Sequence, residues 1–112
     1  MDYVVEPEKR VPVLMHADVV VVGGGVAGLA AAVASARNGA VTALVERNNC
    51  FGGNATSGMV MALGGYNIWT KPRRRVLGGL PQEIISRMVD MDGARESNSV
   101  ILEYDPEAFK SV

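Results

Sequence analysis

The feature that most constrains this chain is the stretch of residues 17–46. An apolar run, residues 18–22, leads into a glycine-rich turn at residues 23–28. A small-residue helical segment, residues 29–38, follows the turn, and a β-branched run at residues 41–45 comes before the closing glutamate. This order predicts a strand–turn–helix–strand unit. The turn reads G-x-G-x-x-G in the context that gives this pattern its meaning, so the sequence indicates a dinucleotide-binding unit.

Each glycine of the turn has its own physical reason. Gly23 permits a tight turn out of the strand, and Gly25 lets the backbone approach a pyrophosphate closely. Gly28 allows the helix to pack tightly on the strand. The start of the helix then directs free N–H groups and the positive end of its dipole at the phosphates. The residues expected to bind the cofactor here are Gly23, Gly24, Gly25, Val26, Ala27 and Gly28.

Glu46 supplies a second part of the pattern. It follows Gly28 by 18 residues and stands at the end of the second predicted strand. A carboxylate at this place accepts hydrogen bonds from the two hydroxyls of a ribose, and it repels a 2′-phosphate. The pattern therefore disfavours a phosphorylated nicotinamide cofactor. The alternative is a glycine-rich turn that binds nothing.

Composition sets the outer limits. The chain has 112 residues, enough for at most one small domain, and a formal net charge of −1. This charge argues against a nucleic-acid or anionic-membrane partner. A single cysteine, Cys50, excludes an internal disulfide and a cysteine-built metal site. The charged first ten residues lack the apolar core of a signal peptide, and we expect a cytoplasmic protein.

Residues 19–36 form an uncharged run of 18 residues, which reaches the length of a membrane span. The run is rich in glycine and alanine, and the three glycines within it suit a turn better than a continuous helix. A strand followed by a helix accounts for the whole run. We therefore reject a membrane span.

Beyond Glu46 the pattern weakens. A second glycine-rich loop is predicted at residues 50–58, where Asn54 offers a hydrogen-bonding side chain; a flexible surface loop is the alternative for this segment. Residues 59–69 fit a helix or a strand equally well. The basic run at residues 71–75 is expected to be a solvated loop, with contact to an acidic substrate or a cofactor phosphate as the alternative.

The last third is predicted to contain two helices. Pro81 suits the start of a helix over about residues 80–91, which has one apolar face. A polar loop at residues 95–99 and a short strand at residues 100–102 follow. Asp105 then caps a second helix, and the sequence ends about two turns later. Because a doubly wound domain needs more strands than these, we expect the chain to be the N-terminal part of a longer protein.

Taken together, these residues resemble the FAD-dependent oxidoreductases that carry a two-dinucleotide-binding-domain fingerprint. Within that family the similarity is greatest to the branch that includes the flavin subunit of heterodisulfide reductase. It extends over nearly the whole chain. The segments that carry it are Glu6-Pro7, Val11-Pro12-Val13, residues 18–28, the spacing of Ala32, Ala36 and Gly39, Glu46, Gly52-Gly53, and residues 78–84 and 104–109.

The resemblance implies an α/β fold, the N-terminal part of a Rossmann-like FAD-binding domain. Residues 1–16 would be a lead-in, and residues 17–112 the partial domain. FAD would be the cofactor, with its pyrophosphate on the glycine turn and its adenosine ribose on Glu46. Further cofactor contacts would come from Arg47, Gly52, Gly53 and Asn54, the last three along the path toward the flavin.

Two departures limit what the resemblance implies. Disulfide reductases with this fingerprint place a redox cysteine pair after the glycine loop, whereas Cys50 precedes the loop and stands alone. Some relatives carry an iron–sulfur cluster, but one cysteine cannot ligate it. Dithiol chemistry and cluster binding are therefore not expected, and no metal ligand or catalytic residue is identified.

Three functions stay open at this level. The favoured one is an FAD-dependent oxidoreductase that passes electrons from a small-molecule substrate through bound flavin. The second is an NAD-dependent dehydrogenase that uses the same glycine motif, against which Gly52-Gly53 and Gly78-Gly79 argue. The third is a truncated nucleotide-binding module without activity. A redox partner and self-association are both compatible with the sequence.

Overall fold

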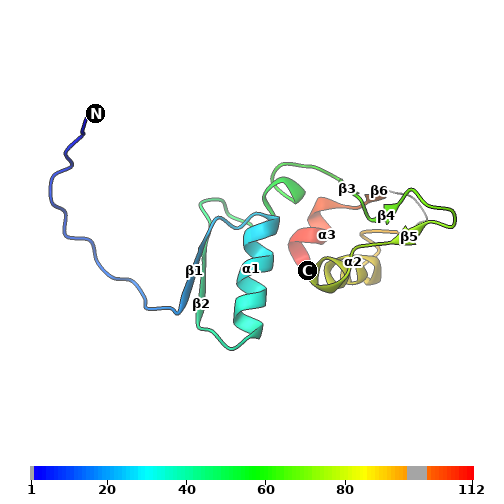
Figure 1. The fold of residues 1–112 in the computed structure, drawn as a ribbon, viewed down its shortest axis with the longest axis horizontal. Helices are drawn as coiled ribbons and strands as arrows, with labels where there is room; N and C mark the ends of the chain where they lie inside the picture. Colours follow the sequence, from blue (N-terminus) through cyan, green and yellow to red (C-terminus); the bar gives the residue numbers. More distant parts are fainter. Residues whose placement is uncertain (1, 96–100) are drawn as a thin grey trace.

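The computed structural model describes residues 2–95 and 101–112 of a mixed α/β chain (Figure 1). Residues 2–16 form an extended, exposed arm, and the packed part of the described structure follows it. The elements, in chain order, are β1 (Val19–Val22), α1 (Val26–Arg37), β2 (Thr42–Val45), the 3₁₀ turn η1 (Gly53–Ala55), β3 (Ala62–Gly64), β4 (Asn67–Ile68), β5 (Arg74–Arg75), α2 (Gly79–Asp90), β6 (Ile101–Glu103) and α3 (Pro106–Ser111).

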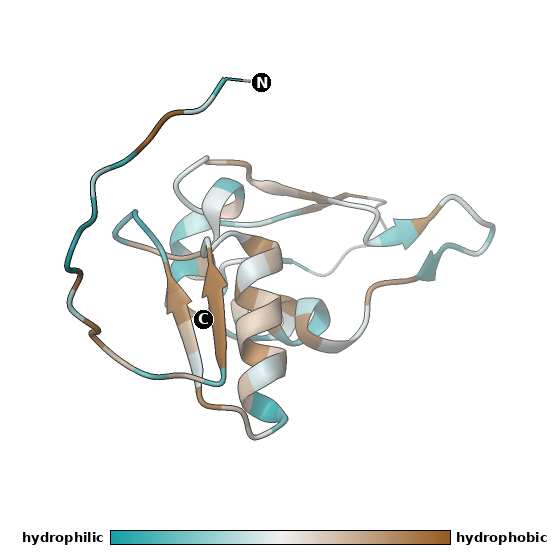
Figure 2. Ribbon diagram, turned by 60° about the vertical axis from the view of Figure 1, so that its left-hand side comes forward, coloured by the Kyte–Doolittle hydropathy of each residue, from teal (hydrophilic) through white to brown (hydrophobic). Residues whose placement is uncertain are grey.

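The first half of the fold is a parallel strand pair with a helix on one face. β1 and β2 pair in register from Val19 opposite Thr42 to Val22 opposite Val45. The alanine-rich helix α1 lies close against both strands, because alanine side chains leave little distance between helix and sheet. The other face is bare: the side chain of Val22 is 82% exposed, and Figure 2 shows both strands as strongly hydrophobic.

The hydrophobic core lies in the second half. Ile85 and Met88 on α2 and Leu102 on β6 are fully buried, because the apolar residues of α2 recur on one face of the helix. The rings of Tyr104 and Phe109 join this core with their centroids 5.7 Å apart. The remaining buried members of the core are Ala55, Tyr66, Ala94 and Ala108.

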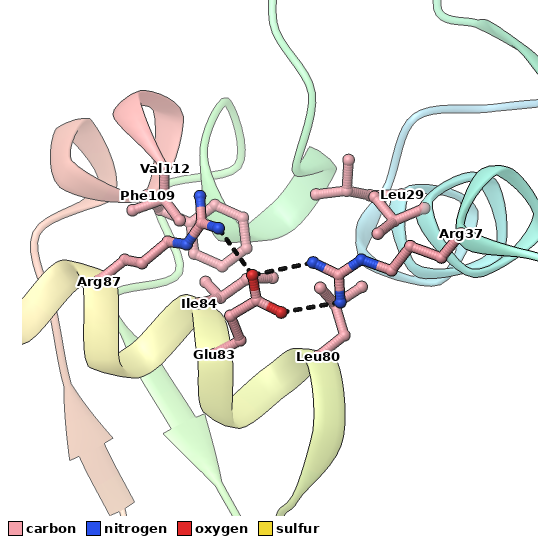
Figure 3. A pocket seen from close by; sticks show the side chains of 9 residues that line it. Leu29, Arg37, Leu80, Glu83, Ile84, Arg87, Phe109 and Val112 are labelled. Atoms are coloured by element: carbon pink, nitrogen blue, oxygen red, sulfur yellow. Dashed lines mark hydrogen bonds and ion pairs between the residues drawn. The ribbon is translucent and has the colours of Figure 1, made fainter.

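A charged cluster joins the two halves. Glu83 on α2 lies between two arginines, and Figure 3 shows its carboxylate facing both. Its oxygens are 2.8 Å and 2.9 Å from nitrogens of Arg37 on α1, and 2.7 Å from a nitrogen of Arg87. Hydrogen bonding and the charge of Arg37, with Arg87 assisting, hold the pKa of Glu83 below its ordinary value. The cluster borders an apolar cavity of about 140 Å³ between α1, α2 and α3.

Most predicted elements are present within one to three residues of their expected bounds, with one correction. The basic run at residues 71–75 is not a loop throughout. Its last two residues form β5, which pairs antiparallel with β4. The prediction rested on the run of charged side chains, whereas this strand pairing is made by the backbone, about which charged side chains say nothing. Residues 59–69, for which the sequence left helix and strand open, contain the short strands β3 and β4.

Two further expectations fall partly outside the described residues. The predicted polar loop at residues 95–99 is described only at Arg95, and the predicted strand at residues 100–102 is described from Ile101 onward, within β6. Within residues 2–95 and 101–112, no helix has the length and apolar character needed to cross a bilayer.

The core predicts a large effect of Ile85→Ala. Removing a fully buried isoleucine side chain leaves a cavity, and the free energy of unfolding should fall by about 2–5 kcal/mol. Chemical denaturation followed by circular dichroism measures this change. Ser86→Ala, at the exposed neighbouring position, should change the same quantity by less than about 0.5 kcal/mol. A similar loss in both variants would contradict the placement of the core.

Candidate dinucleotide-binding site

The turn between β1 and α1 is held by close backbone contacts. Gly23 has a φ of +101°, a conformation that favours glycine, and its N–H donates to the carbonyl of Val45 at 2.8 Å. A Cβ placed on Gly28 would lie 1.8 Å from the carbonyl oxygen of Gly23. The helix can therefore leave the strand at this angle only if residue 28 is glycine.

Gly25 differs from its neighbours, because the space beside it is open. It is the N-cap of α1 with φ −65° and ψ 178°, and a Cβ built on it meets no atom within 4 Å. No side chain caps the helix at this end. Uncapped N–H groups and the positive end of the helix dipole therefore face a space that an anion can enter.

The second glycine loop packs directly on the first. The N–H of Gly52 donates to the carbonyl of Gly24 at 2.7 Å, and Gly25 and Gly52 form a parallel bridge. A Cβ on Gly53 would lie 3.1 Å from the Cα of Gly25, so the two loops touch through backbone alone. Asn54 continues this loop as an exposed residue of η1.

Thr56 holds the second loop in shape, a role that the sequence did not reveal. Its side chain is completely buried, and its Oγ1 donates to the carbonyl of Phe51 at 2.6 Å. A Cβ on Gly52, which has a φ of +104°, would lie 2.5 Å from the threonine Cγ2. In the sequence, the sign of this arrangement is a threonine three residues after the glycine pair Gly52-Gly53. This sign is weak, because the burial of Thr56 is visible only in the structure.

Glu46 anchors the glycine turn from the end of β2. One carboxylate oxygen accepts the N–H of Gly24 at 2.7 Å, and the other accepts the backbone N–H and the side-chain amide of Asn48, each at 2.8 Å. The backbone hydrogen bonds of Asn48 and Gly24 hold the pKa of Glu46 below its ordinary value. An ionised carboxylate has about four acceptor positions, so these bonds are compatible with further acceptance from a ribose hydroxyl.

A cavity of about 540 Å³ lies next to Glu46, between β2, the loop that follows it and α3. This volume is within the usual range for small-molecule sites. The lining residues are Leu29, Leu44, Glu46, Asn48, Asn49, Cys50, Phe51, Phe109, Lys110 and Val112. The cavity thus extends from Glu46, the residue expected to bind a ribose, to α3 in the second half of the fold.

The fold brings the expected site residues together at one end of the β1–β2 pair. Val26 and Ala27 form the exposed first turn of α1, and Arg47 is exposed directly after Glu46. The charge of Arg47 contributes to the low pKa of Glu46. His16 lies on the extended arm, away from this group, as an exposed residue. In the described residues, no group of three or more metal-ligating side chains occurs.

The site combines an open glycine at the start of α1, the parallel strands β1 and β2 that precede and follow this helix in the chain, and a carboxylate directly after β2. These are the features of the dinucleotide-binding class of site. The model of the FAD dependent oxidoreductase family matches residues 18–112, and the chain belongs to this family. Membership implies FAD as the cofactor. No curated protein and no solved structure matched the chain.

The contact at Gly28 predicts that Gly28→Ala disrupts the turn. A methyl group 1.8 Å from a backbone oxygen forces β1 and α1 apart, and the free energy of unfolding should fall by about 2 kcal/mol or more. Thermal unfolding measures this effect. Gly64→Ala, where a Cβ meets no atom within 4 Å, serves as the control and should be neutral or slightly stabilising. Equal stability of the two variants would contradict the geometry of the turn.

The hydrogen bonds to Glu46 predict a loss of stability in acid. The pKa of this carboxyl is lowered from 4.5 in the folded state, so its contribution is present above pH 4.5 and is lost as the pH falls through the folded pKa. The unfolding midpoint should therefore fall more steeply with acidification in the natural chain than in Glu46→Gln. Scans between about pH 3 and 6 test this difference. Parallel profiles for the two proteins would contradict the role of the carboxylate.

Proposed function

We propose that the glycine turn and Glu46 bind the ADP half of FAD, and that the chain is the FAD-binding segment of an oxidoreductase. The observation that carries the proposal is the open space at Gly25, in a turn where Gly24, Gly28 and Gly53 are all closely packed. A Cβ on Gly23 likewise meets no atom within 4 Å, but Gly25 is the open glycine that stands as the N-cap of α1, so its open side gives a direction of approach. That direction leads to the uncapped start of α1, which suits a pyrophosphate.

In this proposal, different residues bind different parts of FAD. The backbone N–H groups at the start of α1 bind the pyrophosphate, and Glu46 accepts hydrogen bonds from the adenosine ribose. Gly52, Gly53 and Asn54 form the next surface along the chain, which supports a path toward the flavin ring. Arg47, exposed directly after Glu46, would add a positive charge beside the ribose-binding carboxylate. Bound FAD would accept a hydride or an electron pair from a substrate.

NAD is the competing cofactor, because the same turn and carboxylate bind either dinucleotide. Two observations favour FAD. The family that matches residues 18–112 is FAD-dependent. The second glycine loop packs on the first, which supports our proposal that it continues the binding surface toward the ribityl chain of FAD. Displacement of bound FAD by excess NAD would contradict this assignment.

Within the family, we place the chain near the branch of the heterodisulfide reductase flavin subunit, on the similarity of residues 78–84 and 104–109. The first segment lies at the start of α2, and the second lies around α3, where Phe109 lines the cavity at Glu46. Our proposal for this branch includes neither dithiol nor cluster chemistry, because Cys50 is the single cysteine. A cytoplasmic location and a small-molecule substrate are part of the same proposal, which assigns no catalytic group.

The test is Gly25→Ala, with Gly78→Ala as its matched control. Both glycines are extended N-caps of 12-residue helices without a side-chain cap, and a Cβ on either meets no atom within 4 Å. The two variants should therefore fold alike. Only Gly25→Ala places a methyl group against the pyrophosphate, so it alone should bind FAD about tenfold or more weakly.

Flavin absorbance after gel filtration and a titration of FAD into the stripped protein measure the effect. Circular dichroism establishes that both variants are folded. Full retention of FAD by Gly25→Ala would overturn the assignment of the pyrophosphate to this turn. An equal loss in Gly25→Ala and Gly78→Ala would show that helix capping, and not contact with the cofactor, controls binding.

A further inference from the structure

A basic hairpin projects from the part of the fold opposite the N-terminal arm. We define it as residues 66–76, in which β4 pairs antiparallel with β5. Figures 1 and 2 both show its turn extending beyond the rest of the chain. It lies away from the glycine turn, and the proposed function leaves it without a role.

The positive charge of the chain is concentrated in this hairpin. It contains Lys71, Arg73, Arg74 and Arg75, and residues 47–82 include no aspartate or glutamate. The whole chain has a formal charge of −1, so with four cations in the hairpin the remaining residues carry −1 − 4 = −5. A strongly positive projection therefore stands on a negative body.

The hairpin also presents a large apolar surface. The Trp69 side chain is 80% exposed, and the guanidinium of Arg73 lies 5.0 Å from the centroid of its ring. This distance is that of a cation–π contact, which holds the ring beside the charges. The hydroxyl of Thr70 donates to the carbonyl of Pro72 at 2.9 Å and braces the turn between them. Tryptophan and arginine are both enriched among the residues that contribute most to binding at protein interfaces.

The base of the hairpin is fixed in the core. Tyr66 is 2% exposed and belongs to the buried cluster. Arg75 donates to its hydroxyl at 3.2 Å and lies 5.9 Å from the centroid of its ring. A tip held on an anchored base loses little conformational freedom on binding, and such preorganisation favours association.

We propose that the basic hairpin docks an acidic segment of a partner protein, with an aromatic or aliphatic side chain of that segment covering Trp69. The four cations can pair with carboxylates of the partner, and the exposed ring of Trp69 can be covered by an apolar side chain next to those carboxylates. A long polyanion such as a nucleic acid or an anionic membrane would also face the body of the chain, whose charge of −5 repels it. A short acidic segment can contact the hairpin alone, so it avoids repulsion from the negatively charged remainder of the chain. The small area predicts a transient, salt-sensitive complex.

The test uses the purified FAD-bound protein and a fluorescein-labelled peptide of glutamates around one central phenylalanine. Fluorescence anisotropy should show binding at about 50 mM salt that weakens about tenfold or more by about 500 mM, because exposed charges are screened. A peptide with glutamine in place of glutamate should not bind. Tight binding of that neutral peptide would overturn the electrostatic part of the proposal.

Two double variants locate the site. Lys71→Gln with Arg74→Gln removes two exposed cations from the hairpin. This double variant should bind the glutamate peptide about fivefold or more weakly. Lys9→Gln with Arg10→Gln removes the same charge from the exposed arm and should leave the affinity within about twofold. Equal losses in both would show that net charge alone attracts the peptide, which overturns the proposal.

Trp69→Ser separates the apolar contact from the charges. It should weaken the binding of the glutamate peptide that has a central phenylalanine. It should not change the binding of a glutamate peptide that has alanine at that position. FAD content should be unchanged in all variants, which distinguishes failure here from failure of the cofactor site. Stronger binding of a single-stranded RNA or of phosphatidylserine vesicles than of the peptide would overturn the assignment to an acidic protein segment.

Discussion

The contact between two glycine loops determines how this structure is built. The hydrogen bond from the N–H of Gly52 to the carbonyl of Gly24 joins the strand–helix–strand unit to the rest of the chain. The Cα of Gly25 lies against Gly53 with no room for a side chain between them. Because both surfaces are backbone, they approach more closely than side chains permit.

A site made from backbone has consequences for recognition. N–H groups at a helix start bind any phosphate of suitable size, so they give affinity with little selectivity. Selectivity comes from the few side chains present, and Glu46 is the one that is fixed in place, through Gly24 and Asn48. A carboxylate held this way favours a free ribose over a phosphorylated one. The backbone hydrogen bonds of Asn48 and Gly24 that hold it lower its pKa, so they favour the charged form that accepts hydrogen bonds.

The sequence predicted those features that depend on local spacing. The turn at residues 23–28 and the carboxylate of Glu46 follow from the rules for one strand–helix–strand unit, and the structure places them as that unit requires. The contact of Gly52 with Gly24, the burial of Thr56 and the ion pair of Arg37 with Glu83 link residues far apart in the chain or depend on the packing around them. Nothing in the residue types alone indicates these partners.

The cofactor site and the hydrophobic core lie in different halves of the fold, and this affects stability. All members of the core cluster come from residue 55 onward, whereas the half that contains the glycine turn buries little beyond Ala32 and Ala43. Parallel strand pairs are normally covered on both faces, but Val20 and Val22 of β1 are exposed. A ligand that binds only the folded turn stabilises it in proportion to the logarithm of its concentration. The FAD binding that we propose at this turn would therefore be coupled to the stability of this weakly buried half.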